Sequence, residues 1–233
     1  MGRRVTLFAE GEYYHIYNRG NSKQIIFRDD YDRERFINLL YLCNSDVNFK
    51  FRDDIERQNI DVFDFDRGEP IVAIGAWVLM PNHFHLYITP IRTVQDGANE
   101  NKKKEVSLIS VFMHRLTKAY VQYFNTKYNR TGSLFEGKFK SVHIENDNQG
   151  KYLFSYIHLN PVKLIQKDWK EKGIRDVEEA LEYLDGYVWS SYADFKGEKR
   201  VQGKILNVEK FPEYFNSISE FDTEILDWIT YSP

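Results

Sequence analysis

The fold is decided by the stretch Ile71-Val72-Ala73-Ile74-Gly75-Ala76-Trp77-Val78-Leu79-Met80-Pro81-Asn82-His83-Phe84-His85-Leu86-Tyr87-Ile88. The apolar run Ile71–Leu79 predicts a buried strand, and the following proline and asparagine interrupt it before a second apolar run begins. Alternate side chains of a strand share a face, so His83 and His85 are expected on one side and Phe84 on the other, in a core. The Cα atoms of the two histidines would lie roughly 6.5–7 Å apart, close enough to bind one metal ion.

The histidine pair alone does not establish a metal site. The chain contains 6 histidines in 233 residues, so two of them at this spacing is a weak signal. Two histidines on one face could equally be half-exposed polar residues of an open sheet. Evidence for a catalytic site must therefore come from other parts of the chain.

Composition restricts the class of protein. The chain is 42% hydrophobic, enough for a substantial core, and Cys43 is its single cysteine, which excludes an internal disulfide. No stretch reaches the roughly 18–20 apolar residues of a membrane span. The segment Met1–Val5 lacks the long apolar core of a signal peptide. We therefore expect a cytoplasmic protein with no membrane partner.

The charge is unevenly distributed, although the net charge is only −3. Between Lys102 and Ile144 there are nine Lys or Arg against two acidic residues, whereas from Glu171 to Pro233 there are seven against fourteen. A basic middle beside an acidic tail favours binding of a polyanion such as nucleic acid. The alternative is that the basic residues form an ordinary solvated face.

The order of elements predicts an α+β fold. Strands are expected at Glu12–Asn18, Ile71–Leu79, Phe84–Thr89 and Leu134–Ile144, and helices at 31–43, 106–124 and 149–160. This order suits a ferredoxin-like antiparallel sheet with helices on one face. Asn44–Pro70 is expected to be a loop or insertion, and Arg92–Glu105 a polar loop.

The helix expected at 149–160 carries a second group of polar residues. Tyr156 and Asn160 are four residues apart and share a helix face, whereas His158 points to the opposite side. Pro161 ends the helix by removing a hydrogen-bond donor. Because the chain has 16 tyrosines, Tyr156 could simply be a packing residue, but the asparagine spacing and the following proline distinguish it.

Five segments together resemble one known family. They are Tyr14-His15-Ile16-Tyr17-Asn18-Arg19-Gly20-Asn21, Trp77-Val78-Leu79-Met80-Pro81-Asn82-His83-Phe84-His85-Leu86, Gly132-Ser133-Leu134-Phe135-Glu136-Gly137-Lys138-Phe139-Lys140-Ser141, Tyr156-Ile157-His158-Leu159-Asn160-Pro161-Val162-Lys163 and Trp189-Ser190-Ser191-Tyr192. In this order they are similar to the REP-associated tyrosine transposases, which are single-tyrosine HUH (histidine, bulky hydrophobe, histidine) transposases. The resemblance spans roughly residues 10–195 and implies the HUH endonuclease type of fold.

The resemblance implies roles for four residues. His83 and His85 match the histidines that bind a divalent metal, Mg²⁺ or Mn²⁺, and Asn160 matches a third, polar ligand. Tyr156 matches the nucleophile. The implied reaction nicks and rejoins single-stranded DNA beside a hairpin through a covalent 5′-phosphotyrosine intermediate.

Further expectations concern DNA contacts and organisation. Basic residues expected to contact single-stranded or hairpin DNA are Arg3, Arg4, Arg19, Lys102, Lys103, Lys104, Arg115, Lys118, Arg130, Lys138 and Lys140. Residues 1–195 are expected to form the transposase domain, with the insertion at about 44–70, and residues 196–233 an acidic appendage. The sequence is compatible with both a monomer and a homodimer.

Three other functions compete with transposition. An HUH replication initiator or relaxase would share the same residues, but the chain has no helicase region and contains the Trp189–Tyr192 motif. A non-cleaving DNA-binding regulator is disfavoured by the complete set of His83, His85, Tyr156 and Asn160. A metal-dependent hydrolase would need acidic ligands or a general base near the histidines, and no residue is spaced for that role.

Overall fold

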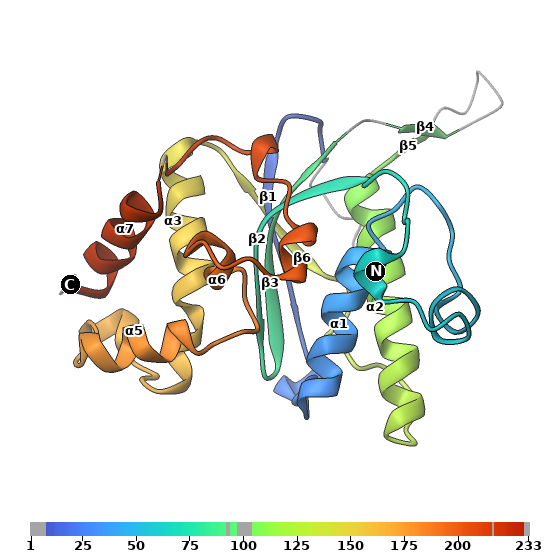
Figure 1. Cartoon of the computed structure of the whole chain (residues 1–233), viewed down its shortest axis with the longest axis horizontal. Helices are drawn as coiled ribbons and strands as arrows, with labels where there is room; N and C mark the ends of the chain where they lie inside the picture. The colour runs from blue at the N-terminus through green and yellow to red at the C-terminus, as the bar shows by residue number, and fades with distance from the viewer. Residues whose placement is uncertain (1–7, 92–93, 97–103, 216, 231–233) are drawn as a thin grey trace.

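A four-stranded antiparallel sheet forms the centre of this computed structural model, which describes residues 8–91, 94–96, 104–215 and 217–230 (Figure 1). Its strands are β1 (Tyr13–Arg19), β2 (Val72–Met80), β3 (His83–Pro90) and β6 (Lys140–Ile144). They lie in the order β2-β3-β1-β6, and each neighbouring pair is antiparallel. The predicted α+β fold with a ferredoxin-like antiparallel sheet is confirmed.

Helices cover both faces of the sheet (Figure 1). The α-helices are α1 (Asp30–Leu42), α2 (Leu108–Lys127), α3 (Asp147–Leu159), α4 (Trp169–Lys172), α5 (Val177–Asp185), α6 (Tyr192–Phe195) and α7 (Ile218–Thr230). Shorter 3-10 or π segments are η1 (Asn21–Lys23), η2 (Phe51–Glu56), η3 (Val62–Asp64), η5 (Asn160–Leu164), η6 (Val201–Ile205) and η7 (Val208–Lys210).

The prediction of helices on one face holds for α1 and α2, which lie together on the same side of the sheet. Helix α3 lies on the opposite side, and α7 packs beside it (Figure 1). The reason is that β2 is buried along its whole length, so both of its faces need an apolar cover. The sheet is thus the middle of three layers.

A β-bulge at Gly75 distributes the side chains of β2 between the two cores. The pairing of β2 with β3 shifts register between Ile74 and Ala76. Ile74 packs with the α1 and α2 layer, whereas Ala76 packs with the α3 layer, although residues two apart normally share a face. The extra residue therefore sets which side chains of β2 meet α3.

Side-chain caps start the three main helices. Asp29 accepts a hydrogen bond from Asp32 N at 3.0 Å before α1, and Ser107 accepts one from Ser110 N before α2. Asn146 starts α3 by accepting a hydrogen bond from Gln149 N. Each cap satisfies a backbone N–H that has no partner within its helix.

The last strand of the sheet is shorter than predicted. Only Lys140–Ile144 forms β6, and residues 134–139 instead bend around the end of β1. Gly137 has φ 69°, in the left-handed region that breaks a strand. The segment is still tied to β1, because Glu136 N donates to Arg19 O at 2.9 Å.

The remaining segments connect or follow the strands of the sheet and the main helices. Residues 44–70 contain η2 and η3 but no strand. Within 92–105 a loop was predicted, but β4 (Val94–Asp96) pairs there with β5 (Lys104–Val106) along its whole length. After residue 195, side chains such as Ile205 and Phe221 are buried in the two cores. Among the described residues, no helix is both long and apolar enough to cross a membrane.

Candidate active site

The histidine strand lies in the middle of the sheet, with its polar face towards α3. His83 begins β3, and Tyr17 of β1 is the register partner of His85. The imidazole rings of His83 and His85 lie 5.0 Å apart between centroids and are nearly perpendicular. Phe84 points the other way and is fully buried in the α1 and α2 layer. The predicted alternation of this strand is confirmed.

Helix α3 places Tyr156 against the histidine strand. The phenol ring lies 5.5 Å from the His85 ring between centroids, edge to face, and is partly exposed. At Asn160 the α-helix gives way to the 3-10 segment η5, because Pro161 cannot continue the α-helical hydrogen bonding. His158 lies on the other side of the helix, where its Nε2 is 2.7 Å from Ser191 Oγ.

A third histidine joins the cluster from β1. His15 Nε2 lies 2.7 Å from His85 Nδ1, and its ring is 6.3 Å from that of Tyr156. The sequence pointed to His15 only as a residue of the sheet face. The pairing of β1 with β3, in which Tyr17 lies opposite His85, brings His15 to the same face.

Several polar atoms at the centre of this cluster have no hydrogen-bond partner among the described residues. They are His85 Nε2 and both polar atoms of the Asn160 amide, all buried. Buried polar groups normally have a hydrogen-bond partner. Unpaired atoms contributed by both β3 and the end of α3 are therefore consistent with a site that binds a ligand. No group of three His, Cys, Asp or Glu in the described part of the chain could hold a metal. Two imidazoles and one amide oxygen nevertheless fit a divalent ion that completes its shell with phosphate oxygens or water.

Comparison with known proteins gives matches only among solved structures. No family model matches the chain, and no curated protein matches its sequence. The chain is similar to a REP-associated tyrosine transposase bound to a REP hairpin, with 15% identity, a TM-score of 0.47, and 87% of this chain and 90% of that chain covered. It is also similar to a bacterial tRNA(His) guanylyltransferase-like protein in complex with ATP, with 13% identity, a TM-score of 0.38, and coverage of 98% and 94%.

The three imidazoles are neutral near pH 7. Burial lowers the pKa of His15 and of His83 to about 4, with nearby lysine charges adding to the effect. Burial also holds the pKa of His85 well below its usual value, and the two neighbouring histidines lower it further. A neutral imidazole keeps a lone pair, so these side chains suit metal ligation or hydrogen bonding.

The Tyr156 phenol is not activated by its protein surroundings alone. Burial raises its pKa above the usual value near 10, and only Asn160, through its side chain, lowers it. A phenol in this state needs a positive charge nearby to react as phenolate at neutral pH. The ammonium Nζ of Lys170 in α4 lies 3.7 Å from the centre of the Tyr156 ring.

Lys170 is a site residue that sequence analysis missed. It lies fourteen residues after Tyr156, outside every motif, and short helix α4 brings it back over the ring. The residue is exposed, yet desolvation of its ammonium, together with the charge of Lys163, lowers its pKa to about 8. In the sequence, only the high lysine content of the segment after Asn160 indicated that a lysine could lie near Tyr156.

Two of the predicted DNA-contact residues lie near this site. Arg19 is the register partner of His83 and forms an ion pair with Glu136. Lys140, in β6, is exposed and lies opposite Tyr17, so it is on the same face as Tyr156.

The other predicted contacts are dispersed. Arg115 donates to Ser45 O at 2.6 Å, and Arg130 donates to Gln24 Oε1 at 3.1 Å, so both also hold loops in place. Lys118 and Lys138 line a cavity on the other face of the sheet. Lys104 begins β5. Four residues of the prediction, Arg3, Arg4, Lys102 and Lys103, lie outside the described residues.

Proposed function

We propose that this protein is a single-tyrosine HUH transposase, which nicks and rejoins single-stranded DNA near hairpins. The observation that carries the proposal is the contact between the rings of Tyr156 and His85, with Asn160 one turn further along the helix. Four of the five sequence segments that resemble the family contribute residues to this same region, namely His15, His85, Lys140 and Tyr156. The fifth, Trp189–Tyr192, bonds His158 through Ser191 on the other side of α3. Within the chain, we assign the activity to residues 1–195 and regard 196–233 as an appendage.

The reaction follows from the residues in the site. The Tyr156 phenolate oxygen attacks the phosphorus of the scissile phosphodiester, and the bond to the 3′ oxygen breaks. The phenolic proton passes to solvent, and the departing 3′ oxygen takes up a proton to become a 3′-OH. The product is a 5′-phosphotyrosine, whose retained phosphodiester energy lets the 3′-OH of another strand reverse the step. No nucleotide triphosphate is required.

The polar groups around Tyr156 have separate tasks. His83, His85 and the Asn160 amide oxygen would hold Mg²⁺ or Mn²⁺, which when bound withdraws charge from a non-bridging phosphate oxygen. The Lys170 ammonium favours the phenolate through its position over the ring. His15 fixes the orientation of His85 by bonding its Nδ1. Arg19 and Lys140 would contact the DNA backbone on the same face.

The test is a gel assay for a covalent protein–DNA adduct. The full chain is incubated with labelled single-stranded hairpin DNA taken from the region flanking its own gene, with Mn²⁺, with Mg²⁺ or with chelator. Tyr156→Phe is compared with Tyr152→Phe, which removes the hydroxyl of the stacked tyrosine one turn earlier, 6.2 Å away between ring centroids. We expect a metal-dependent, denaturant-resistant band that Tyr156→Phe abolishes and Tyr152→Phe retains.

Two results would contradict the proposal. Cleavage without a covalent band, surviving in Tyr156→Phe, would indicate a metal-dependent hydrolase. Tight DNA binding with no cleavage, across a broad set of flanking hairpins and both metals, would indicate a binding protein. Loss of the band in both tyrosine variants would show that the stacked pair acts as a structural unit.

A further inference from the structure

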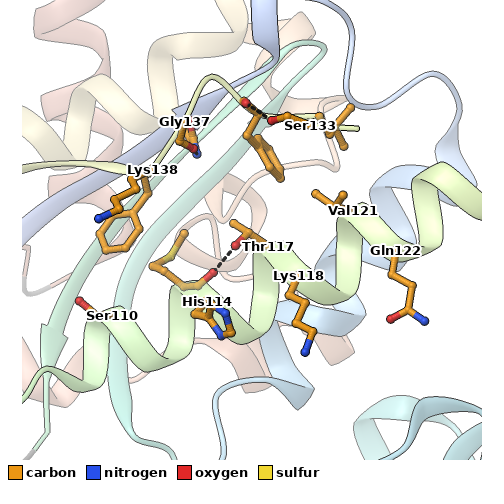
Figure 2. A pocket seen from close by; sticks show the side chains of 14 residues that line it. Ser110, His114, Thr117, Lys118, Val121, Gln122, Ser133, Gly137 and Lys138 are labelled. Atoms are coloured by element: carbon orange, nitrogen blue, oxygen red, sulfur yellow. Dashed lines mark hydrogen bonds between the residues drawn. The ribbon is translucent and has the colours of Figure 1, made fainter. Parts of the chain in front are cut away.

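A cavity of about 800 Å³ opens on the face of the sheet opposite Tyr156. It lies between helix α2 and the bent segment 133–139 that precedes β6 (Figure 2). Its volume lies within the range of small-molecule sites in proteins. None of the residues assigned above to the chemistry lines it, so it is a separate feature of the molecule.

One wall is formed by two adjacent rows of side chains on α2. His114, Lys118 and Gln122 are spaced by four residues, are exposed, and form the outer row. Figure 2 shows Thr117 and Val121 in the inner row, on the side of α2 towards the segment 133–139. The wall therefore changes from polar at the rim to apolar at depth, which suits a ligand with both characters.

The other wall is held in place by hydrogen bonds. Asn18, buried in the sheet, donates from its side chain to Gly137 O at 3.4 Å, and Leu134 O accepts from Asn21 N at 2.9 Å and from Gln24 Nε2 at 3.0 Å. The Ser133 hydroxyl donates to Phe135 O at 2.7 Å, as Figure 2 shows. The cavity is thus preformed, so binding there would cost little conformational entropy.

The charge and aromatic content of the cavity identify the class of ligand. Its lining contains Lys118 and Lys138 on opposite walls and no Asp or Glu. The nearby carboxylate of Glu136 is paired with Arg19 instead. Phe135 and Phe139 add aromatic surface on the side of Lys138. Two cations that flank an aromatic surface match a phosphate-linked aromatic base.

We propose that this cavity binds one unpaired nucleotide of a single-stranded nucleic acid. The base would contact Phe139 and the inner row of α2, and the flanking phosphates would contact Lys118 and Lys138. The identity of the strand as DNA rests on the proposed function, whereas the nucleotide chemistry rests on the cavity. His114 and Gln122 at the rim offer hydrogen-bonding groups to the edge of the base.

The position of the cavity gives it a role in holding the strand. β6 is an edge strand of the sheet, so a chain can pass around it from one face to the other. Lys138 lines the cavity, and Lys140, two residues later, lies on the Tyr156 face. A nucleotide held in the cavity would therefore anchor the strand at a fixed distance from the site of cleavage.

The first test measures binding without cleavage. Fluorescence anisotropy with labelled oligo-dT, which forms no hairpin, is recorded in chelator on the Tyr156→Phe background. The double variant Lys118→Gln/Lys138→Gln is compared with Lys199→Gln/Lys210→Gln, a pair of exposed lysines outside the cavity that makes the same charge change. We expect at least tenfold weaker binding in the cavity variant and a change below twofold in the control.

Salt dependence and photocrosslinking distinguish a site from general charge. Loss of two phosphate contacts should reduce the slope of log affinity against log salt by about 1.4. Oligo-dT carrying 5-iodouracil should crosslink to peptides 110–122 and 133–139. Equal affinity loss in both lysine pairs, or crosslinks confined to other peptides, would overturn the proposal. Because no metal and no Tyr156 hydroxyl is present, these results are independent of the covalent-adduct assay.

Discussion

His15 and His85, from neighbouring strands, are joined nitrogen to nitrogen, with His15 Nε2 2.7 Å from His85 Nδ1. This contact occupies one ring nitrogen of His85 and leaves Nε2, which is buried and has no partner among the described residues, directed to the site. In metal sites, a second group that bonds the far nitrogen of a ligand histidine fixes its tautomer and orientation. His15 has this relationship to His85.

Replacing His15 should weaken metal binding without removing a ligand. His15→Phe keeps an aromatic ring in the sheet but cannot bond His85 Nδ1, so we expect Mn²⁺ affinity to fall roughly 10- to 100-fold. The measurement is Mn²⁺ titration followed by electron paramagnetic resonance. His143→Phe serves as control, because that histidine is exposed on the edge strand and bonds Glu12. If His15→Phe binds Mn²⁺ with unchanged affinity, His15 does not position His85 for metal binding.

The cation over the Tyr156 ring should matter for the rate of strand cleavage. Lys170→Met keeps an unbranched side chain one atom shorter but removes its charge, so we expect cleavage to slow roughly tenfold or more. Lys172, at the end of the same helix, is exposed and pairs with Asp168, the residue before the helix, so Lys172→Met should cleave at the normal rate. Rates are taken from single-turnover formation of the covalent adduct.

The same lysine predicts a pH dependence. The Lys170 pKa is lowered to about 8, so its ammonium is present below that pH and is lost as the pH rises through it. The rate advantage of the wild-type protein over Lys170→Met should therefore shrink between pH 7 and pH 9. A ratio that stays constant over this interval would show that charge on Lys170 does not assist the reaction.

Buried neutral histidine should make the protein sensitive to acid. Burial lowers the pKa of His158 to about 3, with the charge of Arg200 adding to the effect, whereas in the unfolded chain the pKa is near 6.5. Below pH 6.5 the unfolded chain binds a proton that the folded protein does not, so the free energy of unfolding falls as the pH drops towards 3. The loss from this residue is about 2 kcal/mol between pH 6.5 and 5.

Urea unfolding at several pH values measures this loss. His158→Phe fits the aromatic surroundings formed by Phe154, Phe195 and Phe221 but cannot titrate. The variant should show a shallower decline of stability between pH 6.5 and 5 than the wild-type protein, whatever its stability at pH 7. Parallel declines would mean that His158 keeps an ordinary pKa in the folded state.

The bulge at Gly75 should tolerate no side chain. A Cβ there would lie 2.9 Å from Cε1 of Phe211, an aromatic ring packed against β2. Gly75→Ala should therefore destabilise the protein by roughly 1–3 kcal/mol and loosen the segment around Phe211. Unfolding in urea gives the first quantity, and limited proteolysis after Leu206 gives the second.

Gly186 provides the matched control for this change. A Cβ at Gly186 would meet its nearest atoms at 3.6 Å and 3.8 Å, which is ordinary contact. Gly186→Ala should leave both stability and proteolysis close to wild type. Should the two alanine variants behave alike, the close approach of Phe211 to β2 would not contribute to holding the C-terminal segment.

The sequence by itself determined the elements and half of the site. Continuous apolar runs placed β2 and β3, because long buried strands need apolar side chains on both faces, and a period of 3.6 placed the main helices. The same rules put His83 beside His85 and Tyr156 on the face of Asn160. They failed at 134–139, where left-handed Gly137 and hydrogen bonds to β1 replace a strand that the alternating pattern had predicted.

Only the tertiary structure decided which of these faces meet. The bulge at Gly75 and the pairing of β1 with β3 are set by packing between segments far apart in the chain. That packing brings His15 to His85 and Lys170 over Tyr156, and it places Lys118 opposite Lys138. Spacing along the chain fixes the direction of a side chain within its own element, whereas its partner across space depends on the register and stacking of elements.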